Sequence, residues 1–147
     1  MFTVRIARLL SVATLAVVAI AVQVPTAAAG SADAKSRVVM QVSDADPGKW
    51  NLALNNAKNV QSDLGATNVE VEIVAYGPGI GMLKAESVVG NRIEEAMKAG
   101  VKVVACENTM HGQKLTKADM LNGIAYTPAG VTEIMRRQQE GWAYLRP

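Results

Sequence analysis

Cysteine and histidine are almost absent from the 147-residue chain, which has one of each, Cys106 and His111. A single cysteine cannot form a disulfide within the chain, so it stays free, pairs with another chain or carries a chemical group. A structural zinc site needs four nitrogen or sulfur ligands, and one cysteine with one histidine cannot supply them. We therefore expect neither an intramolecular disulfide nor a metal, and no motif of the sequence predicts another cofactor.

An excess of basic residues is also absent once the N-terminal segment is set aside. The whole chain has 15 Lys and Arg against 13 Asp and Glu, but Arg5 and Arg8 lie in residues 1–29, which hold no acidic residue. Without that segment the chain has 13 residues of each sign and a formal net charge of zero. Because no cluster or run of Lys and Arg remains, we expect no binding to nucleic acid or to an anionic surface.

The N-terminal segment has the features of a secretory signal peptide. Two arginines precede an apolar run from Leu9 to Val24, and small residues surround Ala29. A basic start, a short apolar stretch and an Ala-x-Ala site are typical of cleaved export signals. The run is slightly shorter than the roughly 18 residues of a membrane-spanning helix, and no cysteine follows it for lipid attachment. We predict cleavage after Ala29, with Ala34 as the second choice, and a periplasmic location, with an uncleaved membrane anchor as the alternative.

The rest of the chain is long enough for one domain with one core. We expect residues 30–36 to form a flexible mature N-terminus and residues 37–147 to form the domain. Short apolar runs that suggest strands alternate there with stretches of helical periodicity. The expected strands are residues 36–43, 68–77, 101–106, 123–128 and 142–146, and the expected helices are residues 47–64, 85–99, 116–121 and 131–140. This alternation predicts an α/β domain with a mainly parallel sheet and helices on both faces.

Two local patterns sharpen this prediction. Asp46 and Pro47 suit the N-cap and the first position of a helix, which Gly65 would end. In the second strand, apolar residues alternate with Glu70 and Glu72, so we expect both glutamates on a solvent-facing side. Trp142 and Tyr144 near the C-terminus would pack on the sheet by default, with another subunit as the alternative.

Polar and glycine residues follow each of the first three predicted strands. They are Asp44 after the first, the segment Gly77–Gly81 after the second, and the segment Cys106–His111 after the third. In a parallel sheet the carboxyl ends of the strands meet at one edge, where ligands bind. The predicted ligand-binding positions in these loops are Asp44, Gly77, Gly79, Gly81, Asn108 and Thr109.

Two common site chemistries are not supported by these loops. The segment Gly77–Gly81 lacks both the G-x-G-x-x-G spacing and the lysine of a phosphate-binding loop. A tight turn that passes close to the neighbouring strands is the simpler interpretation of its glycines. Asp44 and Asp46 could suggest a hydrolase carboxylate pair, but helix capping already explains Asp46.

Cys106 is the strongest candidate for chemistry, and two interpretations of it remain open. A thiolate is reactive when a cation, a helix N-terminus or backbone N–H groups favour it. His111 could supply charge or a proton, which makes it a weaker candidate, whereas the nearby Glu107 would raise the thiol pKa. The alternative is that Cys106 is a small buried apolar residue and that His111 is an ordinary surface residue.

Three segments together resemble the DsrE/DsrF-like family of small sulfur-relay and related proteins. They are IVAYGPGIGML at Ile73–Leu83, GVKVVACENTM at Gly100–Met110 and the closing AGVTEIMRRQQEGWAYLRP at Ala129–Pro147. The resemblance covers nearly all of Arg37–Pro147, and the closing segment is its most specific part. It implies a three-layer α/β/α fold with a mainly parallel sheet of about five strands, and homo-oligomers that are often trimers or hexamers.

In the sulfur-relay members of that family, a cysteine after the third strand accepts sulfur as a persulfide and passes it on. Cys106 stands at the matching place. The resemblance therefore implies a sulfur carrier that exchanges sulfur with donor and acceptor proteins through Cys106, and the signal peptide adds the expectation that this carrier is exported. The alternative is a module of the same fold without catalysis, which binds a small ligand or assembles with a partner. Whether the protein is an enzyme stays open on this evidence.

Overall fold

The structure is a computed structural model that describes residues 35–147 of the chain. The predicted signal peptide, residues 1–29, and most of the predicted flexible segment, residues 30–36, lie outside the described residues. Ser36, the last residue of that segment, is already the first residue of β1. In the part that is described, no helix is both long and apolar enough to cross a membrane.

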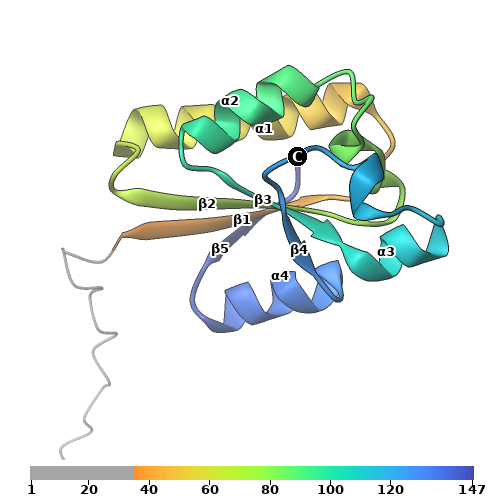
Figure 1. Cartoon of the computed structure of the whole chain (residues 1–147). Coiled ribbons are helices and arrows are strands. Elements are labelled where there is room, and N and C mark those ends of the chain that lie inside the picture. The colour runs from red at the N-terminus through yellow and green to blue at the C-terminus, as the bar shows by residue number, and fades with distance from the viewer. Residues whose placement is uncertain (1–34) are drawn as a thin grey trace, which may run out of the picture. The chain divides into compact units, whose positions relative to one another are not determined.

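A five-stranded parallel sheet forms the middle layer of the fold (Figure 1). The strands are β1 (Ser36–Val42), β2 (Val69–Ala75), β3 (Lys102–Cys106), β4 (Ala125–Thr127) and β5 (Ala143–Leu145). Their order is β4-β3-β2-β1-β5, and all four pairings are parallel. The two longest strands pair over their whole length, from Ser36 opposite Val69 to Val42 opposite Ala75. The five predicted strands are confirmed, and the sheet is wholly rather than mainly parallel.

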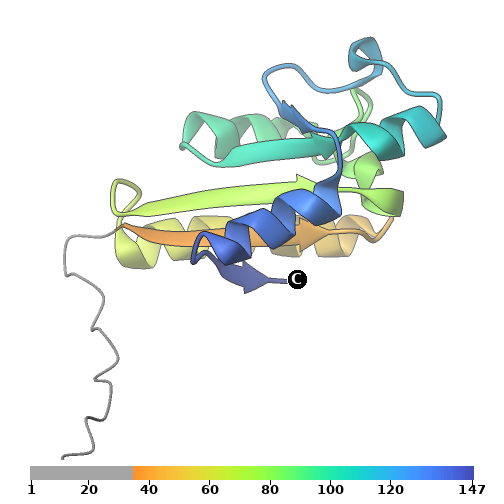
Figure 2. The same cartoon turned by 90° about the horizontal axis from the view of Figure 1, so that it is seen from below.

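Helices cover both faces of this sheet, as Figures 1 and 2 show. The long helix α1 (Pro47–Leu64) and α2 (Gly90–Lys98) lie on one face, and α4 (Gly130–Gln139) lies on the other. Three shorter elements are α3 (Glu107–Gly112) and the 3-10 helices η1 (Gly77–Leu83) and η2 (Lys117–Asp119). The expected three-layer α/β/α fold is therefore confirmed.

The start and end of α1 follow directly from its sequence. The Gly48 N–H donates to Asp46 Oδ1 at 2.7 Å, so Asp46 caps the helix, and Pro47 occupies its first turn. Gly65 ends the helix with a φ of +87°, which glycine adopts without strain. The buried residues Trp50, Ala53, Leu54 and Ala57 recur every three to four positions and face the sheet.

Apolar side chains form one core on each face of the sheet. The larger core joins the sheet to α1 and α2, and the smaller one, beneath α4, contains Val39, Val74, Val104, Ile134 and Trp142. Trp142 is buried in the smaller core, which confirms that it packs on the sheet. Tyr144 instead is exposed on the edge strand β5, and its hydroxyl donates to Gln41 Oε1.

Several predicted boundaries are wrong where short-range bonds compete with a helix. The helix expected from Ala85 begins only at Gly90, because the Ser87 N–H bonds to Lys84 O and the Gly90 N–H to Ser87 O in successive turns. The helix expected at residues 116–121 is the single 3-10 turn of η2. It stops there because an antiparallel bridge between Lys84 and Met120 draws the chain into an extended conformation.

Two segments expected to be loops are helical. Residues 77–83 form the 3-10 helix η1, and α3 begins directly after Cys106. Each is too short for a helical period of apolar residues to show in the sequence. The three glycines and the proline of η1 and the polar residues of α3 usually indicate loops, so they hide the helical conformation of both segments.

Glu72 is the clearest error of the sequence-based prediction, since it is fully buried rather than solvent-facing. Arg137 of α4 holds both of its carboxylate oxygens, with Nη2 at 2.8 Å and Nε at 3.2 Å. Lys102 Nζ lies 3.1 Å from the same carboxylate. A buried carboxylate is tolerated only when it is paired in this way, and the alternation of residues in β2 does not reveal a partner on another element.

The same arginine is the centre of a larger network. Arg137 also contacts Glu133 Oε1 at 3.1 Å and Glu140 Oε2 at 3.1 Å. Its guanidinium carbon lies 4.7 Å from the ring centroid of Trp142, within range of a cation–π interaction. Arg137 therefore joins α4 to the central strand β2 and to the residue that leads into β5.

Replacement of this arginine should be much more costly than replacement of its neighbour. We expect Arg137→Met to lower the free energy of unfolding by about 3 kcal/mol, because Glu72 would keep only Lys102 as a partner. Arg136 is half-exposed, so Arg136→Met should cost at most about 1 kcal/mol. Urea denaturation of both variants measures the difference, and equal losses would show that the Glu72–Arg137 pair does not hold the fold together.

Candidate functional site

The candidate site lies at the carboxyl edge of the sheet, where β3 ends. Cys106 is the last residue of β3 and the N-cap residue of α3, and it is opposite Thr127 of β4 in the register. It is a free cysteine with 4% of its surface exposed. The predicted position at this edge is thus confirmed, and the side chain is nearly buried there.

Hydrogen-bond donors from two helices meet at the Cys106 sulfur. Burial raises the pKa of the Cys106 thiol, but hydrogen bonds from the Thr109 hydroxyl and from the N–H groups of Gly130, Thr109 and Asn108 together hold that pKa below its ordinary value. The Asn108 N–H also donates to Pro128 O at 3.1 Å, so it contributes least to lowering the thiol pKa. Donors that bond to a charged form favour that form, so the site favours the thiolate, the nucleophilic form of cysteine.

Thr109 is held in position by η1. Its Oγ1 accepts the Gly77 N–H at 2.9 Å, which leaves the hydroxyl hydrogen for the sulfur. Gln113, the C-cap residue of α3, donates from Nε2 to Gly77 O at 3.4 Å, so both backbone polar groups of Gly77 bond to α3 or to its cap. The structure thus brings together three residues that the sequence indicated, namely Cys106, Thr109 and Gly77.

Gly130 is the part of the site that sequence reasoning missed. A Cβ at this position would lie 3.0 Å from Tyr76 Cβ and 3.3 Å from Cys106 Cβ, closer than side chains normally pack. Glycine therefore lets the N-terminus of α4 reach the sulfur. The available signal was a glycine at the start of a helical pattern, after Pro128 and Ala129, where a polar capping residue is more usual.

Close packing accounts for two of the other glycines predicted to bind a ligand. A Cβ on Gly79 would meet Val42 O at 2.3 Å, which no neighbouring adjustment could accommodate because the contact is with backbone. A Cβ on Gly81 would lie 3.3 Å from the Trp50 ring. The tight-turn interpretation therefore explains why η1 carries glycine at both positions.

Asp44 belongs to a different part of the edge. It follows β1, which is two strands away from β3, and it pairs with Lys49 at 3.1 Å and Arg146 at 3.6 Å. The hydrogen bond from Lys49, with smaller contributions from Arg146, lowers the pKa of the Asp44 carboxyl. Asp44 thus joins α1 to the C-terminus, and the structure does not bring it to Cys106.

His111 lies on the exposed side of α3. Within residues 35–147, no hydrogen bond or ion pair joins His111 to Cys106, and His111 is not among the groups that shift the thiol pKa. Glu107 is directed to Lys117, at 3.9 Å. No group of three or more His, Cys, Asp or Glu side chains in this part of the chain is arranged to hold a metal ion.

The fold and the site define a small three-layer α/β protein with a single thiol at the carboxyl edge of its sheet. Residues 17–147 match the model of the DsrE/DsrF-like family, and the chain belongs to that family. No curated protein gives a significant match.

The chain resembles several solved structures, including the following two. A protein of unknown function from Methanobacterium thermoautotrophicum is 35% identical, with a TM-score of 0.74, over 77% of this chain and 100% of that one. A conserved protein of unknown function from Bacteroides thetaiotaomicron is 13% identical, with a TM-score of 0.60, over 79% of this chain and 98% of that one. The second is evidence for the fold alone.

Removal of the Thr109 hydroxyl should raise the pKa of the Cys106 thiol. We expect Thr109→Val to shift the thiolate titration to higher pH and to slow alkylation by iodoacetamide at pH 7 several-fold, because a donor to the thiolate is lost. Thr109→Ser keeps the hydroxyl and serves as the matched control. Thiolate absorbance against pH measures the shift, and identical titrations of the Val and Ser variants would contradict the role of this hydroxyl.

Proposed function

We propose that Cys106 accepts a sulfur atom as a persulfide and passes it to an acceptor thiol. The observation that carries this proposal is the meeting of the Thr109 hydroxyl with the Thr109 and Gly130 N–H groups at the sulfur of a free cysteine. Membership of the DsrE/DsrF-like family supports it. Sulfur transfer needs a thiolate nucleophile, and these donors lower the pKa of the Cys106 thiol, which increases the fraction of that form.

The proposed transfer consists of two balanced exchanges. In the first, the Cys106 thiolate attacks the outer sulfur of a donor persulfide, an S–S bond forms at Sγ, and the donor leaves as a thiolate. In the second, an acceptor thiolate attacks the outer sulfur on Cys106, and the Cys106 thiolate is released. Each exchange forms one S–S bond and breaks one, so neither requires an external oxidant or reductant.

The N-terminus of α4 contributes to this chemistry beyond a single hydrogen bond. Gly130 is the first residue of that ten-residue helix. Unpaired N–H groups and the helix dipole give such a terminus a partial positive charge, which stabilises a neighbouring anion. The same groups therefore stabilise the Cys106 thiolate, which attacks in the first exchange and is released in the second.

Burial of Cys106 limits the donors that can reach it. With 4% of the residue exposed, the sulfur is open to solvent over a small area only. A small sulfane donor such as a polysulfide fits this limit better than a bulky disulfide does. The proposal therefore includes selectivity for small donors or for the extended end of a donor protein's persulfide side chain.

The direct test is the intact mass of the protein after treatment with polysulfide. We expect a gain of one sulfur atom that dithiothreitol removes and that Cys106→Ser does not show. A bulky aromatic disulfide should modify the same thiol much more slowly. If the mass does not change under conditions that convert a small-molecule thiol to its persulfide, Cys106 is a structural residue.

A second candidate function, assembly without catalysis, is favoured by the apolar surface. Val131 and Met135 are exposed one turn apart on α4, and Tyr144 and Leu145 are exposed on the edge strand β5. Exposed apolar side chains and an open sheet edge are typical of interaction surfaces. We propose that the protein forms a homo-oligomer, a trimer or hexamer, whether or not Cys106 carries sulfur.

Export is proposed from the N-terminal sequence, in which two arginines, an apolar run and small residues precede the domain. The proposal places the mature protein in the periplasm, in contact with the membrane only during export. An uncleaved anchor is the alternative.

Native mass spectrometry of the protein recovered from the periplasmic fraction tests assembly and export together. We expect a protomer that starts at Gly30 and a complex of three or six copies, because cleavage after Ala29 removes the export signal and the exposed apolar side chains become covered. Cys106→Ser should leave the number of copies unchanged. A monomer at micromolar concentration would exclude the assembly, and a full-length chain in the membrane fraction would exclude cleavage.

A further inference from the structure

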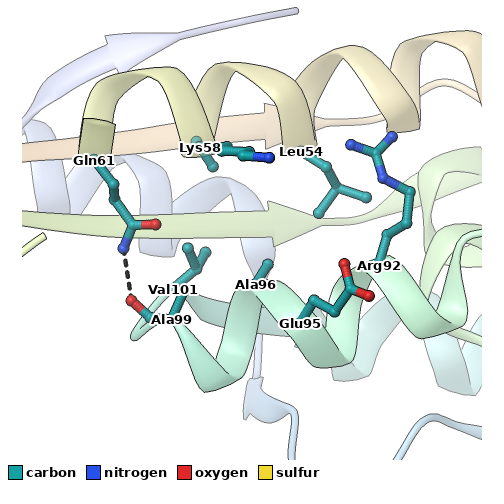
Figure 3. A pocket seen from close by; sticks show the side chains of 9 residues that line it. Leu54, Lys58, Gln61, Arg92, Glu95, Ala96, Ala99 and Val101 are labelled. Carbon is teal, nitrogen blue, oxygen red and sulfur yellow. Dashed lines mark hydrogen bonds between the residues drawn. The ribbon is translucent and has the colours of Figure 1, made fainter. Parts of the chain in front are cut away.

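A cavity between α1 and α2 lies away from Cys106 and has no role in the proposed function. The two helices lie side by side on the same face of the sheet (Figure 1), and the cavity of about 280 Å³ opens between them (Figure 3). Its lining residues are Leu54, Ala57, Lys58, Gln61, Arg92, Glu95, Ala96, Ala99 and Val101. Three of the nine are alanines, too small to fill the space between the helices.

Hydrogen bonds between the helices close the cavity at both ends. At one end, Gln61 Nε2 of α1 donates to Ala99 O at 2.8 Å. At the other end, Arg92 of α2 donates to Asn55 Oδ1 at 2.7 Å and also to Asn51 Oδ1. These cross-links fix the spacing of the helices, so the cavity is preformed.

The floor of the cavity is apolar and its rim is charged. Leu54, Ala57 and Val101 are buried at the floor. Figure 3 shows the Lys58 ammonium and the Arg92 guanidinium toward the α1 side, with the Glu95 carboxylate on α2. A ligand seated there would place hydrocarbon on the floor and a polar group at the rim.

The rim carries a net positive charge. Among residues 35–147, no carboxylate pairs with Lys58 or Arg92, and the partners of Arg92 are neutral amide oxygens. Glu95 offsets one of the two cations, which leaves a net charge of +1 beside an apolar floor. This combination is complementary to an amphipathic anion and unfavourable for an amphipathic cation.

We propose that this cavity binds a small monocarboxylate with an apolar tail. The carboxylate would lie between Lys58 and Arg92, and the tail would cover Leu54 and Ala57. The cavity has a volume of about 280 Å³. This lies at the small end of ligand pockets and suits a medium-chain fatty acid.

Isothermal titration calorimetry of the full chain with octanoate tests the proposal. Octanoate should bind at one site, whereas acetate, which lacks the tail, and octylammonium, which carries the opposite charge, should bind at least tenfold more weakly. Equal affinity for octanoate and octylammonium would show that the rim charge selects nothing. No octanoate binding at millimolar concentration would overturn the proposal outright.

Four variants locate the binding site. Ala96→Leu should abolish binding because the larger side chain fills the cavity, and Lys58→Gln should weaken it about tenfold through loss of a charged partner. Glu95→Gln should tighten it, since a repulsive charge is removed. Lys98→Gln, which changes an exposed lysine of α2 outside the lining, should have no effect.

Thermal denaturation shows whether Ala96→Leu folds. If it does not, the direction in which Glu95→Gln changes the octanoate affinity still tests the proposal. Weaker octanoate binding by Glu95→Gln, or equal effects of Lys58→Gln and Lys98→Gln, would place the ligand elsewhere. Cys106→Ser should bind octanoate normally, so this result is independent of sulfur transfer.

Discussion

The buried ion pair between Glu72 and Arg137 is the interaction on which the arrangement of the protein depends. It fixes α4 to the central strand β2 through two hydrogen bonds to a fully buried carboxylate. Gly130, at the other end of that helix, supplies an N–H group to the Cys106 sulfur. A charge pair on one side of the sheet thus sets the geometry of the thiol at its edge. Removal of the pair would be expected to disturb both stability and the thiol pKa.

The carboxyl edge of the sheet contains two separate groups of side chains. Cys106, Thr109 and Gly77 meet where β3 ends, with Gly130 from α4. Asp44 forms ion pairs on the far side of β2, with residues that hold α1 and the C-terminus in place. A parallel sheet brings strand ends to one edge, but the strand order decides which of them are neighbours. The first group is suited to nucleophilic chemistry, and the second has a structural explanation.

Local sequence signals predicted most of the fold. Asp46, Pro47 and Gly65 marked the limits of α1, and the apolar runs marked all five strands, because caps and short-range periodicity depend on neighbouring residues. The burial of Glu72 could not be predicted in this way, since its partner Arg137 is 65 positions away. Likewise, Cys106 was a visible candidate, but the approach of Gly130 to its sulfur depends on how α4 packs against the sheet.

The hydrogen-bond donors around Cys106 lower the pKa of its thiol even though the residue is buried. Titration of thiolate absorbance in the wild-type protein, with Cys106→Ser as the blank, measures this directly because the chain has one cysteine. We expect a midpoint clearly below that of an unperturbed cysteine, which is about 8.5. A midpoint at or above that value would mean that burial outweighs the hydrogen bonds, and Cys106 would then be a core residue at the end of a strand.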